Sequence, residues 1–402
     1  MIQVGNALYR RVLLGLCLCV LAGVLAFGLW PFTSRPHNDV SWIRNQNGLV
    51  FGDYGSILSS APLRVDESPD GPCSLELWLQ PGLIHDANTM LAFDSPENSP
   101  HFGIEQSLDN VALERTVAGH KTPKSQIIYI PHVLRRDTPL FITLTSGQGG
   151  LSIYVNGAFV RSSSAFSFTR RDLSDQMVVG NSPFANDSWS GVLRGIGLYN
   201  KELTAEEIRQ NYAAWTASGQ PRALAEKEAT AVFTFGERTG TVVHNQVPGG
   251  IDLYIPDHYL VLHPPFLQAF WRLTDSGWGF WKNALINVGG FVPLGFFFGV
   301  YFSQSMPVPR ATLLTIILGC AVSFLIEVTQ YYLPTRDSGS LDLITNTLGT
   351  MLGALMYGPG FVQRILARFG IVSRENAQVN PAPGDPLLKA ESDQPEVLVR
   401  KY

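Results

Sequence analysis

The sequence predicts a multidomain protein that combines an all-β jelly-roll sandwich with an α-helical membrane domain of four transmembrane helices. Two observations carry this prediction. Apolar residues make up 45% of the 402 residues, an ordinary share, but they are concentrated in long runs at the start and toward the end of the chain. Between these runs, short alternating segments are separated by Gly, Pro, Asn, Asp and Ser, which is typical of a sandwich of short strands.

Charge and cysteine content exclude two classes of protein. The net charge is −4 and no basic block is present, which argues against nucleic acid as a partner. Three of the four cysteines, Cys17, Cys19 and Cys320, fall within predicted spans. Cys73 alone lies in the soluble part, so an internal disulfide cannot form there and the fold is not a disulfide-stapled one.

Residues 1–38 are predicted to form an N-terminal transmembrane anchor. Arg10-Arg11 precedes an apolar run from Val12 to Phe32. Signal peptides also have a basic flank, but this run is longer than a signal-peptide core and no small-x-small cleavage site follows it. We therefore expect a retained first span.

Residues 39–218 are predicted to form the jelly roll. Thr204 and Glu207 make a capping box that predicts a short helix at the end of this region. Asn156-Gly157 follows a strand-like run and precedes Ala158-Phe159-Val160, which strongly indicates a two-residue hairpin. Four segments alternate with a period of two, as half-buried strands do: 74–79, 140–144, 151–155 and 191–198.

These segments resemble a known family. Trp78, Leu151 through Gly157, Val178 through Gly180, and Gly191 through Ile208 follow one another in the order of the laminin-G-like, concanavalin A-like jelly-roll domain. The resemblance implies a domain that binds glycans or proteins, in some members through a bound calcium ion.

The sequence assigns no residues to such a calcium ion. Asp172, Asp175 and Asp187 lie in predicted turns, where aspartate is expected for backbone reasons. We therefore predict no metal site and no cofactor, and calcium in the jelly roll remains an open alternative.

Residues 219–282 are predicted to connect the jelly roll to the next span. A polar linker at 219–230 is followed by two strand-like runs, 231–235 and 251–255, which we interpret as extra strands of the same external domain. Residues 257–282 hold three tryptophans and further aromatic residues. Such residues favour the membrane interface. A hydrophobic connector packed on the jelly roll is the alternative.

Three further apolar segments, 283–303, 311–333 and 342–358, approach the roughly 20 residues that cross a bilayer. Arginines flank the predicted spans at positions 10, 11, 310, 364 and 368, and the positive-inside rule places these positions in the cytoplasm. Both termini are then cytoplasmic, and the jelly roll is external or periplasmic. Residues 359–402 are predicted to be a cytoplasmic tail that is disordered toward its end.

Six polar residues recur in and beside the last three segments. Polar side chains in hydrocarbon are costly and need partners or a function. The predicted topology brings them to one outward-facing membrane pocket, which consists of Asn287, Glu327, Gln330, Arg336, Asp342 and Asn346. The pocket is a binding site in one interpretation. In the other it is a hydrogen-bond cluster that holds the helices together, with Arg336 neutralising a carboxylate and Asp342 capping a helix.

The same residues carry a second resemblance. Asn287 with Phe291 through Gly295 matches the early motif of VanZ-like membrane proteins. The later motifs are matched in order and spacing by Glu327 with Gln330, Arg336, Asp342, Asn346 through Gly349, and Gly353. The loop 334–340 departs from the family pattern, because it carries Arg336 but is extended before Asp342. The resemblance implies four spans, of which 12–32 supplies the first, so that the jelly roll is an insertion. Members of this family are associated with resistance to the glycopeptide antibiotic teicoplanin.

Together these features favour a binding protein of the inner membrane that acts at the cell envelope. Its expected partners are membrane lipid, a glycan or lipid-linked envelope component, and in one alternative a protein. We expect the protein to act in a process that involves exopolysaccharide or in glycopeptide resistance. One alternative is a membrane enzyme acting on a polyprenyl-linked sugar through Glu327. The pocket contains no His or Cys and no zinc-like spacing, so we predict no catalytic residue. The other alternative is a structural scaffold.

Overall fold

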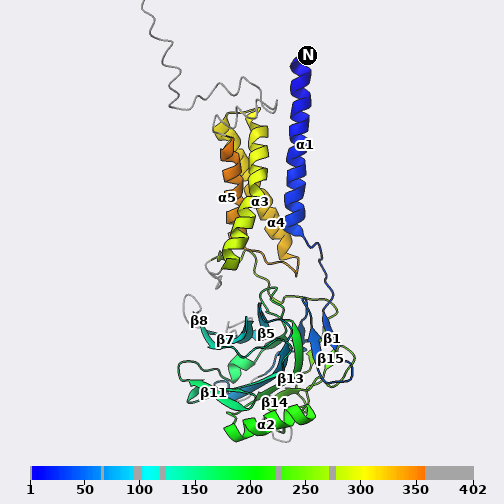
Figure 1. The fold of residues 1–402 in the computed structure, drawn as a ribbon, viewed down its shortest axis with the longest axis vertical. Helices are drawn as coiled ribbons and strands as arrows, with labels where there is room; N and C mark the ends of the chain where they lie inside the picture. The colour runs from blue at the N-terminus through cyan, green and yellow to red at the C-terminus, as the bar shows by residue number, and fades with distance from the viewer. Residues whose placement is uncertain are drawn as a thin grey trace, which may run out of the picture. The chain divides into compact units, whose positions relative to one another are not determined.

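The protein is described by a computed structural model that covers residues 2–64, 68–94, 102–117, 124–222, 229–270 and 278–357. The chain divides into two compact units (Figure 1). The helical unit comprises residues 1–32, 266–332 and 338–402, and the β unit comprises residues 33–265 and 333–337. The tail predicted at 359–402 and residues 271–277 of the aromatic connector lie outside the described residues.

The β unit consists of two antiparallel sheets of eight strands each. The first sheet has the order β1-β2-β13-β4-β9-β10-β11, and β14 pairs with β13. Its strands are β1 (Val40–Trp42), β2 (Leu49–Phe51), β4 (Cys73–Pro81), β9 (Leu140–Gly147), β10 (Gly150–Val155), β11 (Ala158–Ser163), β13 (Gly191–Tyr199) and β14 (Ala229–Phe233).

The second sheet has the order β15-β16-β3-β12-β5-β6-β7-β8. Its strands are β3 (Ile57–Ser59), β5 (Ala87–Asp94), β6 (Phe102–Ser107), β7 (Asn110–Val117), β8 (Lys124–Ile130), β12 (Gln176–Val179), β15 (Val242–Val243) and β16 (Leu253–Tyr254). The short helix η1 (Arg170–Leu173) precedes β12. The predicted β-sandwich is therefore confirmed.

One continuous hydrophobic core fills the space between the two sheets. Leu75, Leu77 and Leu79 of β4 contribute from the first sheet, and Leu91 and Phe93 of β5 contribute from the second, all of them buried. Alternate residues of a strand point to one face, so this spacing places every second side chain in the core. The core explains why the period-two pattern predicts the strands.

The hairpin between β10 and β11 has the predicted turn. Asn156 and Gly157 adopt φ values of 50° and 77°, which are the positive angles of a type I′ turn. The side-chain oxygen of Asn156 also accepts a hydrogen bond from the backbone N–H of Phe141 at 3.0 Å. The Asn-Gly prediction is confirmed.

Helix α2 (Ala205–Ser218) packs on the first sheet, next to β13 and β14 (Figure 1). The predicted capping box is present, because the Thr204 side chain accepts from the Glu207 backbone N–H and the Glu207 side chain accepts from Thr204. Ile208 and Trp215 of α2 bury against Phe141 of β9. Since this helix covers the outer face, Ser74 and Glu76 of β4 are also buried, and the prediction that segment 74–79 is half-buried is wrong.

The chain after α2 returns to both sheets. β14 pairs with β13 through Phe233 and Ile196, and β16 pairs with β3 through Leu253 and Ser59. β15 pairs with β16 and becomes the edge of the second sheet. Strands that follow α2 in the sequence thus extend the sandwich formed by the strands that precede it.

The helical unit contains α1 (Ile2–Leu29), α3 (Trp278–Ser303), α4 (Val308–Tyr331) and α5 (Ser340–Met356). Among the described residues, three helices are long and apolar enough to cross a membrane: Leu8–Leu29, Phe280–Ser303 and Val308–Tyr331. α5 has 17 residues, about 26 Å at 1.5 Å per residue, slightly less than the ~30 Å hydrocarbon core. A fourth span remains a prediction.

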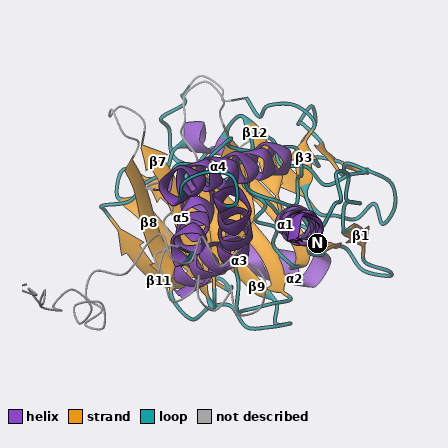
Figure 2. Ribbon diagram, turned by 90° about the horizontal axis from the view of Figure 1, so that it is seen from above, coloured by secondary structure: helices purple, strands orange, loops and turns teal. Residues whose placement is uncertain are grey.

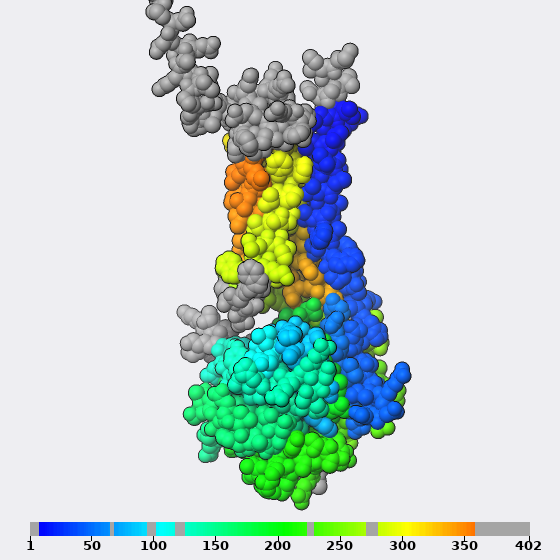
Figure 3. Space-filling view, viewed as in Figure 1, coloured from blue at the N-terminus to red at the C-terminus, as the bar shows by residue number. Residues whose placement is uncertain are grey.

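Helices α3 and α5 contact each other backbone to backbone. A Cβ atom at Gly349 would collide with the carbonyl of Val288, and one at Gly353 would collide with the carbonyl of Val292. Glycines four residues apart permit such close approach of two helices. α1 packs through Cys17 against α3 and α4 residues, and Figures 2 and 3 show it beside α3.

Candidate functional site

One buried face of α4 carries polar residues. Gly319, Ser323, Glu327 and Gln330 follow one another at intervals of four, four and three residues, which places them on the same side of the helix. Glu327 is 1% exposed and Gln330 is 3% exposed. A carboxylate and an amide at this degree of burial require hydrogen-bond partners.

Helix α5 supplies most of these partners. The side-chain amide of Asn346 donates to the hydroxyl of Ser323 at 3.0 Å. One turn further along α4, the Glu327 carboxylate accepts the backbone N–H of Gly339 at 2.8 Å. Gly339 is the N-cap of α5 and its cap has no side-chain hydrogen bond of its own. Glu327 thus satisfies a backbone donor at the start of α5.

The remaining contacts tie in α1 and α3. Gln330 donates from Nε2 to the carbonyl of Gly28 in α1 at 2.6 Å. Asn287 of α3 donates from Nδ2 to Oδ1 of Asp342 at 2.8 Å. Asp342 lies in the first turn of α5, where the helix dipole favours a negative charge. The cap is Gly339, so the prediction that Asp342 caps the helix is wrong.

Five of the six predicted pocket residues therefore lie in the helical unit and take part in hydrogen bonds between its helices. The sixth, Arg336, belongs to residues 333–337 of the β unit, where its backbone N–H donates to the carbonyl of Leu333. Its pairing with Glu327 or Asp342 stays a prediction. We refer to Asn287, Glu327, Gln330, Asp342 and Asn346 as the helical polar cluster.

Two acceptors of this cluster are unfilled within the described part of the chain. The buried oxygens Oε1 of Gln330 and Oδ1 of Asn346 have no hydrogen-bond partner there. Because the Nε2 atom of Gln330 donates to a carbonyl, its Oε1 atom must be an acceptor. A hydroxyl or ammonium group could donate to it.

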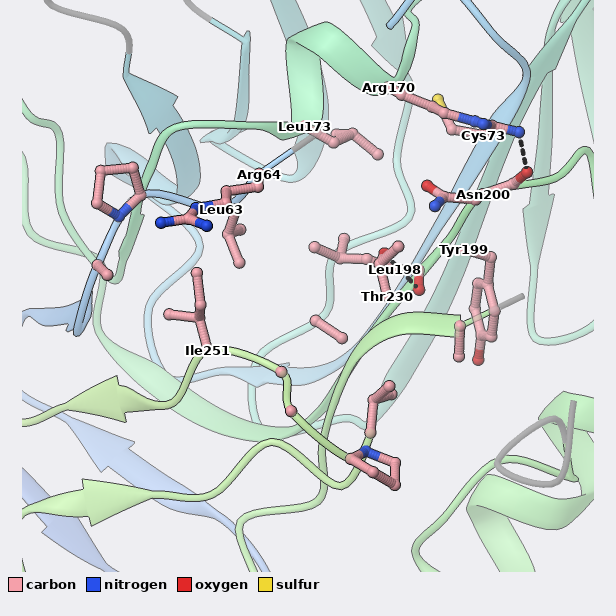
Figure 4. A pocket seen from close by; sticks show the side chains of 18 residues that line it. Leu63, Arg64, Cys73, Arg170, Leu173, Leu198, Tyr199, Asn200, Thr230 and Ile251 are labelled. Atoms are coloured by element: carbon pink, nitrogen blue, oxygen red, sulfur yellow. Dashed lines mark hydrogen bonds between the residues drawn. The ribbon is translucent and has the colours of Figure 1, made fainter. Parts of the chain in front are cut away.

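The β unit contains a pocket of about 610 Å³ (Figure 4). The loop before β4, η1, the end of β13, β14 and the loop before β16 form its walls. Its lining is Ala61, Pro62, Leu63, Arg64, Cys73, Arg170, Leu173, Leu198, Tyr199, Asn200, Ala229, Thr230, Ala231, Val247, Pro248, Gly249, Gly250 and Ile251. We call it the Arg64–Arg170 pocket.

Polar and apolar groups share the pocket surface. Leu173, Leu198 and Ile251 are among the side chains that point into it in Figure 4. Cys73 is buried at its edge, where its thiol contacts the carbonyl of Phe168 at 3.8 Å. Burial raises the pKa of the Cys73 thiol far above its usual range, so this cysteine stays protonated and unreactive.

Sequence reasoning missed both arginines of this pocket. Arg64 follows β3 and Arg170 begins η1, more than a hundred positions later in the chain. Neither arginine belongs to a motif, and only the pairing of strands from both sheets brings their loops together. No pattern in the sequence would have identified them.

The three turn aspartates have structural partners. Asp172 accepts hydrogen bonds from the Arg115 guanidinium at 3.0 Å and from the Thr169 backbone at 2.7 Å, and it lies in η1, not in a turn as predicted. Asp175 has a positive φ of 66°. The described residues include no group of three or more His, Cys, Asp or Glu that could hold a metal ion.

Asp187 is the most perturbed of the three. It accepts a hydrogen bond from the Thr89 hydroxyl at 2.6 Å. Burial raises its pKa to about 6, and the nearby charge of Asp337 acts in the same direction. Asp337 accepts the backbone N–H of Asn186 at 3.0 Å, and burial also raises the pKa of Asp337. The Asp337 carboxylate thus attaches residues 333–337 to the rest of the β unit.

Two family models match the sequence. The model for VanZ/LLP1 proteins matches residues 231–363, and the model for the concanavalin A-like lectin/glucanases superfamily matches residues 52–209. The chain carries a VanZ-like domain and a concanavalin A-like domain. The predicted resemblances are confirmed. The VanZ-like match also includes β14, β15 and β16, which belong to the two sheets of the β unit.

Comparison with solved structures finds similar folds at low sequence identity. A candidate carbohydrate-binding protein from Bacteroides ovatus is 14% identical, with a TM-score of 0.37, over 55% of this chain and 58% of that one. A heptameric SAP-like pentraxin from Limulus polyphemus is 11% identical, with a TM-score of 0.33, over 54% and 93%. The receptor-binding domain of botulinum neurotoxin D is 15% identical, with a TM-score of 0.33, over 46% and 48%.

The chain thus spans a little over half the length of the Bacteroides protein and about half of the neurotoxin domain. No curated protein matches the sequence. The VanZ-like domain, together with the three apolar helices, makes this chain a membrane protein.

Proposed function

We propose that this VanZ-like protein is a membrane-anchored carbohydrate-binding protein that acts at the cell envelope. The observation that carries the proposal is the Arg64–Arg170 pocket in the β unit, of which residues 52–209 match the concanavalin A-like model. Its volume of about 610 Å³ lies within the range of roughly 300–1,000 Å³ that is usual for small-ligand sites. A surface shared by polar and apolar groups suits the hydroxyls and the faces of one or two sugar residues.

The proposed topology has four spans with both termini in the cytoplasm. Arg10, Arg11 and Arg310 support this orientation through the positive-inside rule. α5 would be the fourth span, and membrane lipid would surround the exposed side chains of Leu313, Ile317 and the similar apolar residues. The concanavalin A-like domain then lies on the external or periplasmic side, where envelope glycans are found.

Cysteine labelling tests this orientation in intact cells. The variant Ser164→Cys introduces an exposed thiol in the β unit, and Ser305→Cys introduces one between α3 and α4. We expect a membrane-impermeant maleimide to label the first variant and not the second, with the parent protein as the background. If only the Ser305→Cys variant is labelled, the orientation is the reverse of the proposed one.

A second binding role for the helical polar cluster rests on the unfilled oxygen of Gln330. A lipid-linked envelope component carries hydroxyl or ammonium groups in its head group, and these groups could donate to Oε1 of Gln330. Glu327 would then hold the start of α5 in place beside the ligand. The opposing explanation is a purely structural cluster, and the Glu327 variants in the Discussion distinguish the two.

The test of carbohydrate binding uses the full chain in lipid nanodiscs on an array of peptidoglycan fragments and bacterial exopolysaccharides. We expect saturable binding to a subset of these glycans, with empty nanodiscs as the control. Absence of binding to every glycan would refute the proposed function. Deletion of the gene tests the envelope role, because glycopeptide resistance predicts increased sensitivity to teicoplanin.

A further inference from the structure

The Arg64–Arg170 pocket has an uncompensated positive charge. Arg64 and Arg170 are the charged side chains among its described lining residues, and no carboxylate is among them. Within the described residues, neither arginine forms an ion pair, whereas the neighbouring Arg171 lies 3.4 Å from Asp70. Two guanidinium groups at one pocket, with no carboxylate among its described lining residues, favour an anionic ligand.

Arg170 is held in a fixed position. Its Nε atom donates to the carbonyl of Pro72 at 3.1 Å, and its Nη2 atom donates to the carbonyl of Asn200. The guanidinium also lies directly over Gly71, where a Cβ atom would contact it at 3.0 Å. A guanidinium has five N–H donors, so Nη1 retains donors for a ligand. Because its geometry is preset, binding would cost little side-chain entropy.

Arg64 is placed differently. Its side chain is exposed, and in Figure 4 it lies on the other side of Leu173 from Arg170. The side chains of Leu198 and Ile251 also line the pocket. A ligand of this pocket would combine an oxyanion with a body that packs on an apolar surface.

We infer that the pocket selects acidic sugars, namely glycans that carry a carboxylate or a phosphate, and that Arg64 and Arg170 provide the guanidinium groups that bind such anionic groups. This inference rests on the proposed function, because it specifies the class of glycan. Guanidinium groups form paired, charge-assisted hydrogen bonds with both oxyanions. Recognition by guanidinium groups requires no metal ion, so we expect chelation by EDTA to leave binding unchanged.

The experiment measures binding of small probes to the full chain in nanodiscs by ligand-observed NMR. The probes are D-glucuronate, glucose 1-phosphate, glucose and inorganic sulfate. We expect glucuronate or glucose 1-phosphate to bind at least tenfold more tightly than glucose, since charge-assisted hydrogen bonds are worth about 1.5 kcal/mol or more. The two acidic probes distinguish a uronic acid ligand from a phosphorylated one.

Three variants locate the binding site. Arg170→Gln and Arg64→Gln should each weaken binding of the acidic sugar about tenfold. Arg171→Gln is the matched control, because Arg171 is adjacent to Arg170, pairs with Asp70 and does not line the pocket. An unchanged tryptophan-fluorescence unfolding curve shows that each variant is folded.

Four outcomes would overturn the inference while leaving glycan binding intact. In the first, glucose binds as tightly as glucuronate, and in the second, sulfate binds as tightly as the acidic sugars. In the third, Arg171→Gln weakens binding of the acidic sugar as much as Arg170→Gln does. In the fourth, addition of EDTA abolishes binding of the acidic sugar. Full binding of the acidic sugars in the Arg64→Gln/Arg170→Gln double variant would also reject this pocket as the site. If neither the array nor any sugar probe shows binding, the proposed function itself is wrong.

Discussion

Glu76 of β4 accepts a hydrogen bond from the indole Nε1 of Trp215 in α2 at 2.9 Å. The same carboxylate accepts from the Tyr199 hydroxyl at 2.7 Å and from the Asn211 amide at 3.1 Å. Glu76 and Trp215 are both fully buried. A carboxylate with three donors thus joins α2 to the first sheet from within an apolar layer, where an unpaired one would be very costly.

Glu76 should make stability depend on pH. Burial raises its pKa from 4.5 to about 7, although the hydrogen bonds from Tyr199, Trp215 and Asn211 act in the opposite direction. Between these values the folded state binds more protons than the unfolded state, so the free energy of unfolding falls as pH rises through this range. The full loss is on the order of 3 kcal/mol at about 1.4 kcal/mol per pKa unit.

Glu76→Gln removes this titration. Urea unfolding of the full chain in detergent, followed by tryptophan fluorescence at pH 5 and pH 8, should show a smaller decrease for the variant than for the parent. Glu105 and Asp187 have pKa values raised to about 8 and about 6 and titrate in both proteins, so the difference isolates Glu76. Equal decreases in both proteins would contradict the prediction.

Gly157 tests the β10–β11 turn. Its φ is 77°, and a Cβ atom there would lie 2.9 Å from the ring of Tyr212. Gly157→Ala should lower the free energy of unfolding by about 1 to 2 kcal/mol. Gly149→Ala in the neighbouring turn is the control, because nothing lies within 4 Å of its Cβ position. Similar unfolding curves for the two variants would refute this account.

Gly353 tests the contact between α3 and α5. Gly353→Ala would force the two backbones apart at Val292, so we expect a lower thermal unfolding temperature in detergent and less protein in the membrane. Gly289→Ala is the control on α3, where no atom lies within 4 Å and alanine improves helix propensity. If the two variants have the same unfolding temperature, the close packing of α3 and α5 does not stabilise the unit.

Two substitutions of Glu327 distinguish a binding role of the helical polar cluster from a structural role. Glu327→Leu removes the acceptor for the Gly339 N–H, which should cost about 1 to 3 kcal/mol and lower the amount of protein in the membrane. Glu327→Gln keeps an acceptor oxygen, so we expect near-normal membrane levels. Immunoblots of membrane fractions provide this measurement.

The envelope phenotype of Glu327→Gln then decides between the two roles. Normal levels with a lost phenotype would show that the carboxylate has a role in binding. Normal levels with a normal phenotype would assign Glu327 a structural role alone. Arg336→Ala, measured in the same way, tests whether Arg336, which was predicted to belong to the membrane pocket, contributes to the phenotype.

Local patterns predicted most of the secondary structure for physical reasons that are visible in the structure. Asn156-Gly157 encodes its turn because both residues tolerate positive φ, and Thr204 with Glu207 encodes a helix start through two reciprocal hydrogen bonds. The prediction that segment 74–79 is half-buried was wrong, because period-two alternation identifies only the face of a strand that points into the core. The other face is covered by α2, which lies far along the chain.

The candidate sites divide in the same way. Sequence spacing alone placed Glu327 and Gln330 on one helix face, because the α-helical period fixes which residues share a side. The assignment of Gly339 as the cap of α5, and of Glu327 as the acceptor of its N–H, needed the fold of the loop between two helices. Arg336 was assigned to the same pocket, yet it belongs to the β unit.

By itself the sequence determined that an alternating β domain and apolar helices share one chain, since hydrophobic period and run length are local properties. Tertiary structure alone decided that Arg64 and Arg170 line one pocket and that Glu76 meets Trp215. Such contacts join residues separated by about a hundred positions or more, and they depend on strand order in the sheets. Strand order is set by the burial of the whole core, which no local pattern encodes.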